Sequence, residues 1–235
     1  MRLAQIICIG TALACGSASA LTFTTEDAPP YNFSKDGKMT GSATDIMNEM
    51  LKRTGLQATI TLLPWERAYS MGKDDKDTCV YSTTRTEPRE SLFKWVGPLA
   101  DNNWVLFAKM DSPIKIDKLD DAKKYKIGGY QGDAVAVFLQ SKGFKVDETI
   151  KDPQNVDKLE AGRIDLWASG SQGGPFIAKQ HNPPVKVKPV FNIKETQLYL
   201  ACNKGMGDDL IKKMNDAIGG MIKDGTTQKI FAKYH

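Results

Sequence analysis

The stretch STTRTEPRESLFKWVGP, residues 82 to 98, follows an apolar, β-branched segment and contains two arginines four positions apart, Arg85 and Arg89. The preceding segment, CVYST at 79 to 83, has the composition of a strand. In open α/β sheets, ligands bind beyond the carboxyl ends of strands, where loops lead into helices. The sequence therefore predicts that this loop lies at a ligand-binding edge of a sheet.

Strand-like and helix-like patterns alternate along most of the chain, which is typical of parallel sheets covered by helices. Thr44 and Asp45 are expected to cap the first helix, and Gly55 to end it. Further helices are predicted after Pro64 and over 132–142, 152–161, 174–181 and 210–225. Strands are predicted over 21–25, 57–63, 79–83, 104–109, 125–129, 163–168, 187–191 and 197–202.

Three other loops hold the same position after a predicted strand. They are EDAPPY (26–31), YQGDA (130–134) and SGSQGG (169–174). If the four loops converge on one cleft, that cleft is lined by backbone N–H groups, by hydroxyls and by the guanidinium of Arg85 or Arg89. Donors of this kind suit a small carboxylate ligand.

The first twenty residues differ from the rest of the chain. Arg2 is followed by the apolar run IICIGTALAC and by Ala18-Ser19-Ala20, a small-x-small cleavage pattern. The run is too short to span a bilayer, so residues 1–20 are interpreted as a signal peptide and the mature chain as periplasmic. ALAC resembles a lipidation site, but it lacks a large aliphatic residue three positions before Cys15, which disfavours a lipid anchor.

The charge pattern disfavours one class of function, and the cysteine content limits the state of the thiols. The formal net charge is +4, and acids and bases interleave without a basic run, which disfavours binding of nucleic acids. Outside the cytoplasm, the two remaining cysteines, Cys79 and Cys202, either form a disulfide or lie buried as thiols.

Motifs of catalysis are missing from the sequence. Its two histidines, His181 and His235, lie in a polar turn and at the C-terminus, and no GxSxG, CxxC, HExxH or phosphate-binding loop occurs. We therefore predict no enzyme activity, no metal site and no cofactor.

Six segments, in this order, resemble the periplasmic solute-binding proteins of the amino-acid-binding family, which are the receptors of ABC importers. They are APPYNFSKDGKMTGSATDIMNEMLKRTG, LPWERA, TTRTEPRESLFKWVGPL, IGGYQGDAVAVFL, LEAGRIDLWASG and LIKKMNDAIGGMIKDGTTQKIFAKY. The resemblance covers essentially all of the chain after residue 20.

This resemblance implies an α/β fold of two lobes, each a mostly parallel sheet flanked by helices, which close like a hinge on a ligand. Lobe 1 is expected over 21–100 and 197–235, and lobe 2 over 101–196. The implied partners of a monomeric receptor are a small carboxylate-bearing solute and an inner-membrane ABC permease. A secreted enzyme on the same fold, such as a cyclohexadienyl-type dehydratase, and a free sensor module are the alternatives.

Within the family, the arginine of a T-x-T-x-x-R pattern pairs with the carboxylate of the ligand. Here the pattern is Thr84, Thr86 and Arg89, which leaves a structural role for Arg85. The resemblance places Trp65 against the apolar part of the ligand. Trp167 lies inside an apolar predicted strand and is expected in the core. The full set of expected ligand-binding residues is Glu26, Tyr31, Trp65, Arg67, Thr84, Arg89, Tyr130, Gly132, Asp133, Ala134, Ser169 and Gly170.

One position departs from the family pattern. Amino-acid binders usually have an acidic residue about five positions after the aspartate of the G-R-x-D segment, to hold the α-ammonium of the ligand. Here Gly170 occupies that position. An ammonium without a counter-charge in a closed cleft is costly, so either Glu26 or Asp133 replaces the missing carboxylate, or the ligand is not an ordinary α-amino acid. The family topology also makes the strands of Cys79 and Cys202 neighbours.

Overall fold

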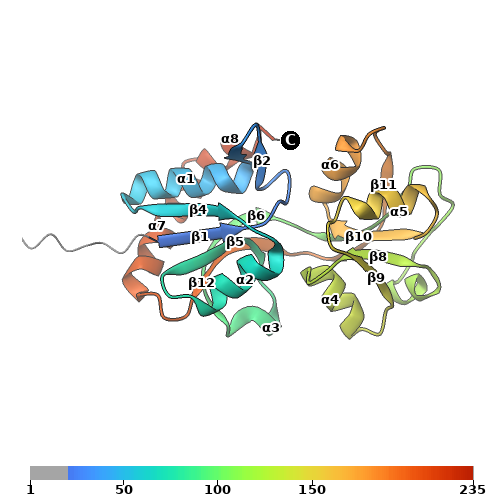
Figure 1. Cartoon of the computed structure of the whole chain (residues 1–235), viewed down its shortest axis with the longest axis horizontal. Coiled ribbons are helices and arrows are strands. Elements are labelled where there is room, and N and C mark those ends of the chain that lie inside the picture. The colour runs from blue at the N-terminus through green and yellow to red at the C-terminus, as the bar shows by residue number, and fades with distance from the viewer. Residues whose placement is uncertain (1–20, 235) are drawn as a thin grey trace, which may run out of the picture.

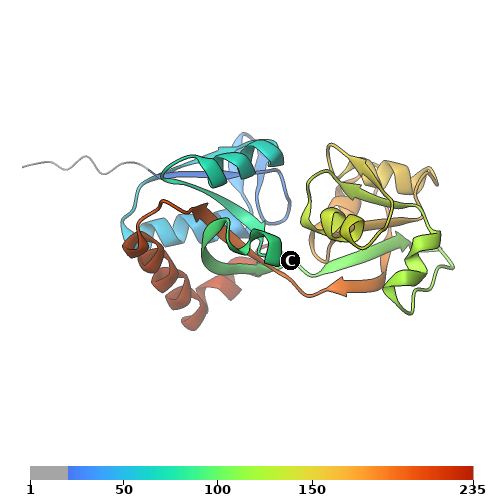
Figure 2. The ribbon, with the colours of Figure 1, turned by 90° about the horizontal axis from the view of Figure 1, so that it is seen from below.

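The computed structural model describes residues 21–234. They form two lobes that lie side by side and are joined by two extended crossings of the chain (Figure 1; Figure 2). One crossing leads from β6 to β7 and the other from β11 to β12. The predicted signal peptide and Cys15 lie outside the described residues.

Lobe 1 is built on a five-stranded sheet with helices on both faces (Figure 1). Its strand order is β4 (Ala58–Leu62), β1 (Leu21–Thr25), β5 (Thr78–Thr84), β12 (Gln197–Asn203) and β6 (Phe93–Asp101). The remaining elements are α1 (Ser42–Thr54), α2 (Trp65–Asp74), α3 (Glu87–Glu90), α7 (Asp208–Lys223), α8 (Thr226–Phe231) and a hairpin of β2 (Phe33–Lys35) and β3 (Lys38–Thr40).

Lobe 2 repeats this plan with a second five-stranded sheet. Its strand order is β11 (Val187–Lys194), β7 (Trp104–Lys109), β10 (Leu166–Gly170), β8 (Ile127–Tyr130) and β9 (Val146–Thr149). The helices are the short 3-10 helix η1 (Leu119–Lys124), α4 (Ala134–Ser141), α5 (Gln154–Glu160) and α6 (Gly173–Gln180).

Both sheets are mixed. Three strands of each sheet are parallel, β4, β1 and β5 in lobe 1 and β10, β8 and β9 in lobe 2. The strands next to the crossings pair antiparallel with their neighbours. The predicted α/β fold of two lobes is confirmed, and the crossing segments add the antiparallel pairs.

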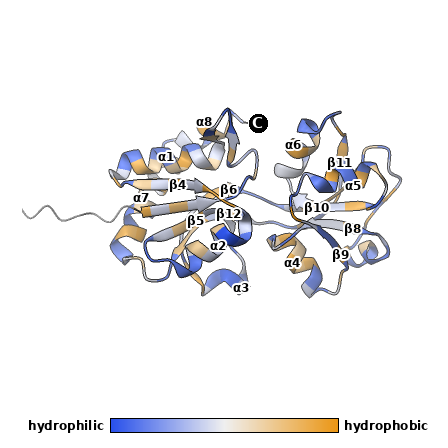
Figure 3. Cartoon of the chain, viewed as in Figure 1, coloured by the Kyte–Doolittle hydropathy of each residue, from blue (hydrophilic) through white to orange (hydrophobic). Residues whose placement is uncertain are grey.

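Apolar residues are frequent along the strands, and apolar and polar residues alternate along the helices (Figure 3). In lobe 1, Ile46, Met47 and Met50 of α1 are fully buried in one cluster with Met214 and Ile218 of α7. Their spacing of three to four residues places them on one helical face. Burial of these two stripes in one cluster on the same face of the sheet stabilises the lobe.

The start of α1 differs from the expected cap at Thr44 and Asp45. The helix begins two residues earlier, after Gly41, whose φ of 118° is unfavourable for a residue with a side chain. A Cβ at Gly41 would collide with the backbone of Tyr31. The Thr44 hydroxyl is instead buried and lies 3.0 Å from the hydroxyl of Tyr81, so Thr44 ties the helix to β5.

Cys79 of β5 and Cys202 of β12 form a disulfide with an S–S distance of 2.10 Å. The two residues are directly opposite each other in the antiparallel pair. Both are completely buried. Of the two alternatives that the sequence left open, the structure therefore has the bonded pair.

Among residues 21–234, none of the helices has the length and apolar character that crossing a membrane requires.

Candidate functional site

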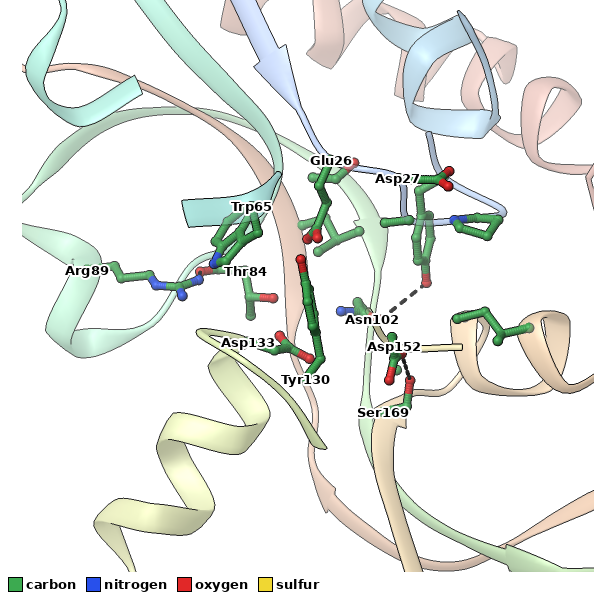
Figure 4. Close-up of a pocket in the computed structure, with 18 residues that line it drawn as sticks. Glu26, Asp27, Trp65, Thr84, Arg89, Asn102, Tyr130, Asp133, Asp152 and Ser169 are labelled. Carbon is green, nitrogen blue, oxygen red and sulfur yellow. Dashed lines mark hydrogen bonds between the residues drawn. The ribbon is translucent and has the colours of Figure 1, made fainter. Parts of the chain in front are cut away.

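The four loops predicted to converge do meet, in a cleft between the two lobes (Figure 4). Lobe 1 contributes the loop after β1 and the end of β5, and lobe 2 contributes the ends of β8, β9 and β10. The cleft is lined by Glu26, Asp27, Ala28, Pro29, Tyr31, Trp65, Ser82, Thr84, Arg89, Asn102, Tyr130, Asp133, Asp152, Ser169, Gly170, Gly173, Ile177 and Leu198.

The two arginines of the TTRTEPR loop have different surroundings. Arg85 is exposed, forms an ion pair with Glu90 and lies over the rings of Trp95 and Tyr199, at 5.5 and 5.3 Å from their centroids. Arg89 lines the cleft. The structure thus separates the two side chains as the threonine spacing predicted.

Arg89 is held in place by both lobes. Its guanidinium lies over the rings of Trp65 and Tyr69, and its N–H groups donate to the carbonyl oxygens of Thr84 and Gly132, each at 3.3 Å. These two bonds and a further one to the Tyr69 hydroxyl use part of its five N–H groups, which leaves others for a ligand. Arg89 therefore combines a fixed position with free donor capacity.

The lobes touch on both sides of the cleft. On one side, the indole N–H of Trp65 donates to the carbonyl oxygen of Gly132 at 3.1 Å, beside the Arg89 bond to the same oxygen. On the other side, Phe33 of β2 and Phe176 of α6 have ring centroids 6.1 Å apart. These contacts connect lobe 1 with lobe 2 across the cleft.

Glu26 points into the cleft from the end of β1 and hydrogen-bonds with Tyr130 of lobe 2 (Figure 4). The pKa of Glu26 is raised to about 8, mainly by burial and also by the carboxylates of Asp133, Asp152 and Asp27, while the hydrogen bond from Tyr130 opposes the shift. Burial likewise raises the pKa of Asp133, against the opposing charge of Arg89. Closure of the lobes therefore gathers like charges around Glu26.

Asp152 is a cleft residue that the sequence analysis missed. It follows β9 at the same edge of the sheet, and its carboxylate accepts bonds from Trp167 Nε1 at 2.8 Å, Asn155 Nδ2 at 3.0 Å and Ser169 Oγ at 3.1 Å. Burial raises the pKa of Asp152 to about 6, although these three donors stabilise the ionised form. Trp167 is fully buried, as predicted, and orients Asp152.

Gly170 packs against the side-chain amide of Asn102. A side chain at position 170 would have to displace this amide. Asn102 lies in the crossing between β6 and β7 and lines the cleft, where Tyr31 donates to its Oδ1 at 3.4 Å. Asp152, bonded to the neighbouring Ser169, brings a carboxylate to this end of the cleft by a different route.

Three of the expected ligand-binding residues do not line the cleft. Arg67 is exposed on α2, because the helix directs Trp65 and Arg67 to different faces. Ala134 is buried in the core of lobe 2. Gly132 contributes its carbonyl oxygen to the lobe contact instead. The other nine, Glu26, Tyr31, Trp65, Thr84, Arg89, Tyr130, Asp133, Ser169 and Gly170, are brought together.

The raised pKa of Glu26 predicts how the stability of the ligand-free chain depends on pH. In the unfolded chain this group titrates near 4.5, and in the folded chain near 8. Between these values the folded state binds the extra proton, so stability falls as pH rises. We expect the free energy of unfolding to be about 3 kcal/mol larger at pH 5 than at pH 8 from Glu26 alone, as measured by urea unfolding. Glu26→Gln should remove most of this slope, and a wild-type stability that stays constant or rises over the window would contradict the assignment.

Among residues 21–234, the structure contains no group of three or more His, Cys, Asp or Glu side chains arranged to hold a metal ion.

Known proteins resemble the chain in sequence over most of its length. It is 27% identical over 211 residues to the L-cystine-binding protein TcyJ of Escherichia coli strain K12, which covers 88% of this chain and 78% of that protein. It is also 27% identical over 218 residues to a probable histidine-binding protein of Neisseria gonorrhoeae, which covers 89% of this chain and 80% of the relative.

Solved structures share the fold. A histidine kinase sensor domain similar to periplasmic binding proteins superposes with a TM-score of 0.84 at 20% identity, covering 92% of this chain and 95% of that one. The substrate-binding protein of an amino-acid ABC transporter superposes with a TM-score of 0.78 at 22% identity, covering 92% of this chain and 99% of that one. At these identities the likeness establishes the fold alone.

The family assignment rests on a match over nearly all of the described chain. The model of the bacterial extracellular solute-binding proteins, family 3, matches residues 21–235. It agrees with the two-lobed fold and with a cleft lined from both lobes. The chain therefore belongs to family 3 of the bacterial extracellular solute-binding proteins.

Proposed function

We propose that this protein is a monomeric periplasmic receptor that captures one small carboxylate-bearing solute, an amino acid or a related compound, and delivers it to an ABC permease in the inner membrane. The observation that carries the proposal is the position of Arg89. Its guanidinium lies in the cleft, fixed by two aromatic rings and by a bond to the opposite lobe.

A planar guanidinium with free N–H groups binds a carboxylate by two parallel hydrogen bonds. The hydroxyl of Thr84, which lines the cleft beside Arg89, adds a donor for the same group. Relatives named as L-cystine-binding and probable histidine-binding proteins support an amino-acid type of ligand.

Closure of the lobes converts binding into a shape that a permease can recognise. Because Gly132 accepts bonds from Trp65 and Arg89 only when the lobes are together, a ligand that bridges the cleft stabilises the closed form. This is a shift of population between an open and a closed state.

The enzyme alternative is tested by asking whether a bound solute is chemically changed. The purified chain is screened by thermal unfolding against amino acids and related carboxylates, and a solute that binds is incubated with the protein and analysed by mass spectrometry. We expect an increase in melting temperature and an unchanged solute. A new product would favour the enzyme, and no stabilisation by any carboxylate solute would argue against the proposed ligand class.

A further inference from the structure

The charges of the cleft do not balance. Four carboxyl groups line it, those of Glu26, Asp27, Asp133 and Asp152, whereas the only guanidinium or ammonium group among the lining residues is that of Arg89. A zwitterionic solute with one ammonium and one carboxylate would leave this excess of negative charge unchanged. Uncompensated charges in a closed cleft are costly.

The acidic groups come from both lobes. Glu26 and Asp27 lie on the loop after β1, and Asp133 and Asp152 lie on lobe 2 (Figure 4). Asp133 and Asp152 act on the charge of Glu26 across the cleft, and each raises its pKa. Closing the lobes therefore brings like charges together, and the solute that stabilises the closed form must offset this repulsion.

The carboxyl groups that could bind a cation lie at two separate places in the cleft. Asp152 lies beside Ser169, held by Trp167 and Asn155. Glu26 directly follows β1 of lobe 1, and its carboxyl group lies beside the hydroxyl of Tyr130. Two anchored carboxyl groups on opposite lobes suit two separate cationic groups of one solute.

An independent feature of the cleft points to a ligand. Thr84 is 4% exposed, its hydroxyl faces the cleft, and this hydroxyl makes no hydrogen bond with another residue of the range 21–234 (Figure 4). The oxygen itself is open to the cleft, so a solute in the cleft can bond to it. Together with Arg89, Thr84 provides donors for about one carboxylate, and the side chains of the cleft contain no second basic group for another.

From these contacts we propose that the cleft selects a solute with two cationic groups and at most one carboxylate, with one cation at Asp152 and Ser169 and the other at Glu26 and Tyr130. This inference rests on the proposed function, and it names the charge class of the solute. Basic α-amino acids and short aliphatic diamines both have this chemistry, and they differ only in the carboxylate that Arg89 would bind.

The test is calorimetric titration of the full mature chain at pH 7.5 with defined probes. L-Lysine, L-ornithine and L-arginine have two cationic groups and one carboxylate, and 1,4-diaminobutane has two and none. L-Glutamine has one of each, and L-cystine has two of each. We expect at least one two-cation probe to bind about 100-fold more tightly than glutamine and cystine. Titration with 1,4-diaminobutane shows whether binding requires a carboxylate on the solute.

Tighter binding of glutamine or cystine than of lysine, ornithine, arginine and 1,4-diaminobutane would overturn this inference and leave the proposed function intact. Failure of all probes, zwitterions included, would overturn both. Calcium chloride serves as a further probe, and competition between Ca²⁺ and the amino probe at equal concentration would overturn the assignment of the carboxylates to organic cations.

Variants test the two places separately. Asp152→Asn and Glu26→Gln should each weaken binding of the two-cation probe by at least about tenfold, because each keeps the side-chain size and removes a carboxyl group that can carry the negative charge opposite a bound cation. Glu148→Gln is the matched control, since Glu148 is an exposed acid of β9 outside the cleft. Equal affinities of Asp152→Asn, Glu26→Gln and the control, each with a cooperative unfolding transition, would overturn the inference.

Discussion

Replacing Arg89 with alanine is expected to weaken binding of the solute by about 1000-fold or more, while the chain stays folded. The substitution removes the proposed bidentate pair with the ligand carboxylate. It also removes the bond to Gly132 of lobe 2, which joins the lobes, and the contacts with Trp65 and Tyr69, which position the guanidinium within lobe 1. Both losses act on the bound state, so the effect exceeds that of a surface arginine.

The loop itself offers a matched control for this prediction. Arg85→Ala removes an exposed arginine four residues away, which pairs with Glu90 outside the cleft, and it should leave the affinity within about twofold of wild type. Arg89→Lys should restore only part of the binding, because an ammonium cannot reproduce the planar fork. Calorimetry of the three variants measures these differences. An affinity of Arg89→Ala within tenfold of that of Arg85→Ala would place the carboxylate elsewhere.

Loss of the disulfide is expected to lower the free energy of unfolding by about 4 kcal/mol. The bond joins β5 to β12 across a sequence separation of 123 residues, which spans all of lobe 2. A closed loop of that length restricts the unfolded chain strongly, so its removal favours unfolding. Both sulfur atoms lie in the core of lobe 1, where the cysteines are fully buried.

The double variant Cys79→Ala, Cys202→Ala allows this effect to be measured by urea unfolding. A reducing agent should destabilise the wild-type chain and leave the double variant unchanged, which separates the bond from other effects of the reductant. If the variant and the oxidised wild type unfolded at the same urea concentration, the disulfide would contribute nothing to stability.

The parts of the site that the sequence predicted share one physical basis. Alternating strands and helices place the loops after β1, β5, β8 and β10 at one edge of each sheet, and this edge faces the other lobe. The distinction between Arg89 and Arg85 came from the resemblance, because Thr84, Thr86 and Arg89 match the T-x-T-x-x-R pattern of the family. Local patterns therefore predicted which loops meet.

The missed residues depend on contacts that no local pattern contains. Asp152 follows β9, whose four residues VDET carry two acids and no apolar run, so the sequence analysis assigned no strand there and no loop at its end. Its role depends on Trp167 and Ser169, which lie on β10. Asn102 was missed for a similar reason, because it lies in a crossing between lobes and reaches the cleft only through the fold.

The most direct test of the account is native mass spectrometry of the ligand-free mature chain after incubation with an equimolar mixture of amino acids and diamines and removal of the unbound material. The account predicts one added solute per wild-type chain, released unchanged on denaturation, and the mass of the bare chain for Arg89→Ala. A wild-type chain without added mass, or the same complex on both proteins, would contradict the claim that this cleft captures a solute through Arg89.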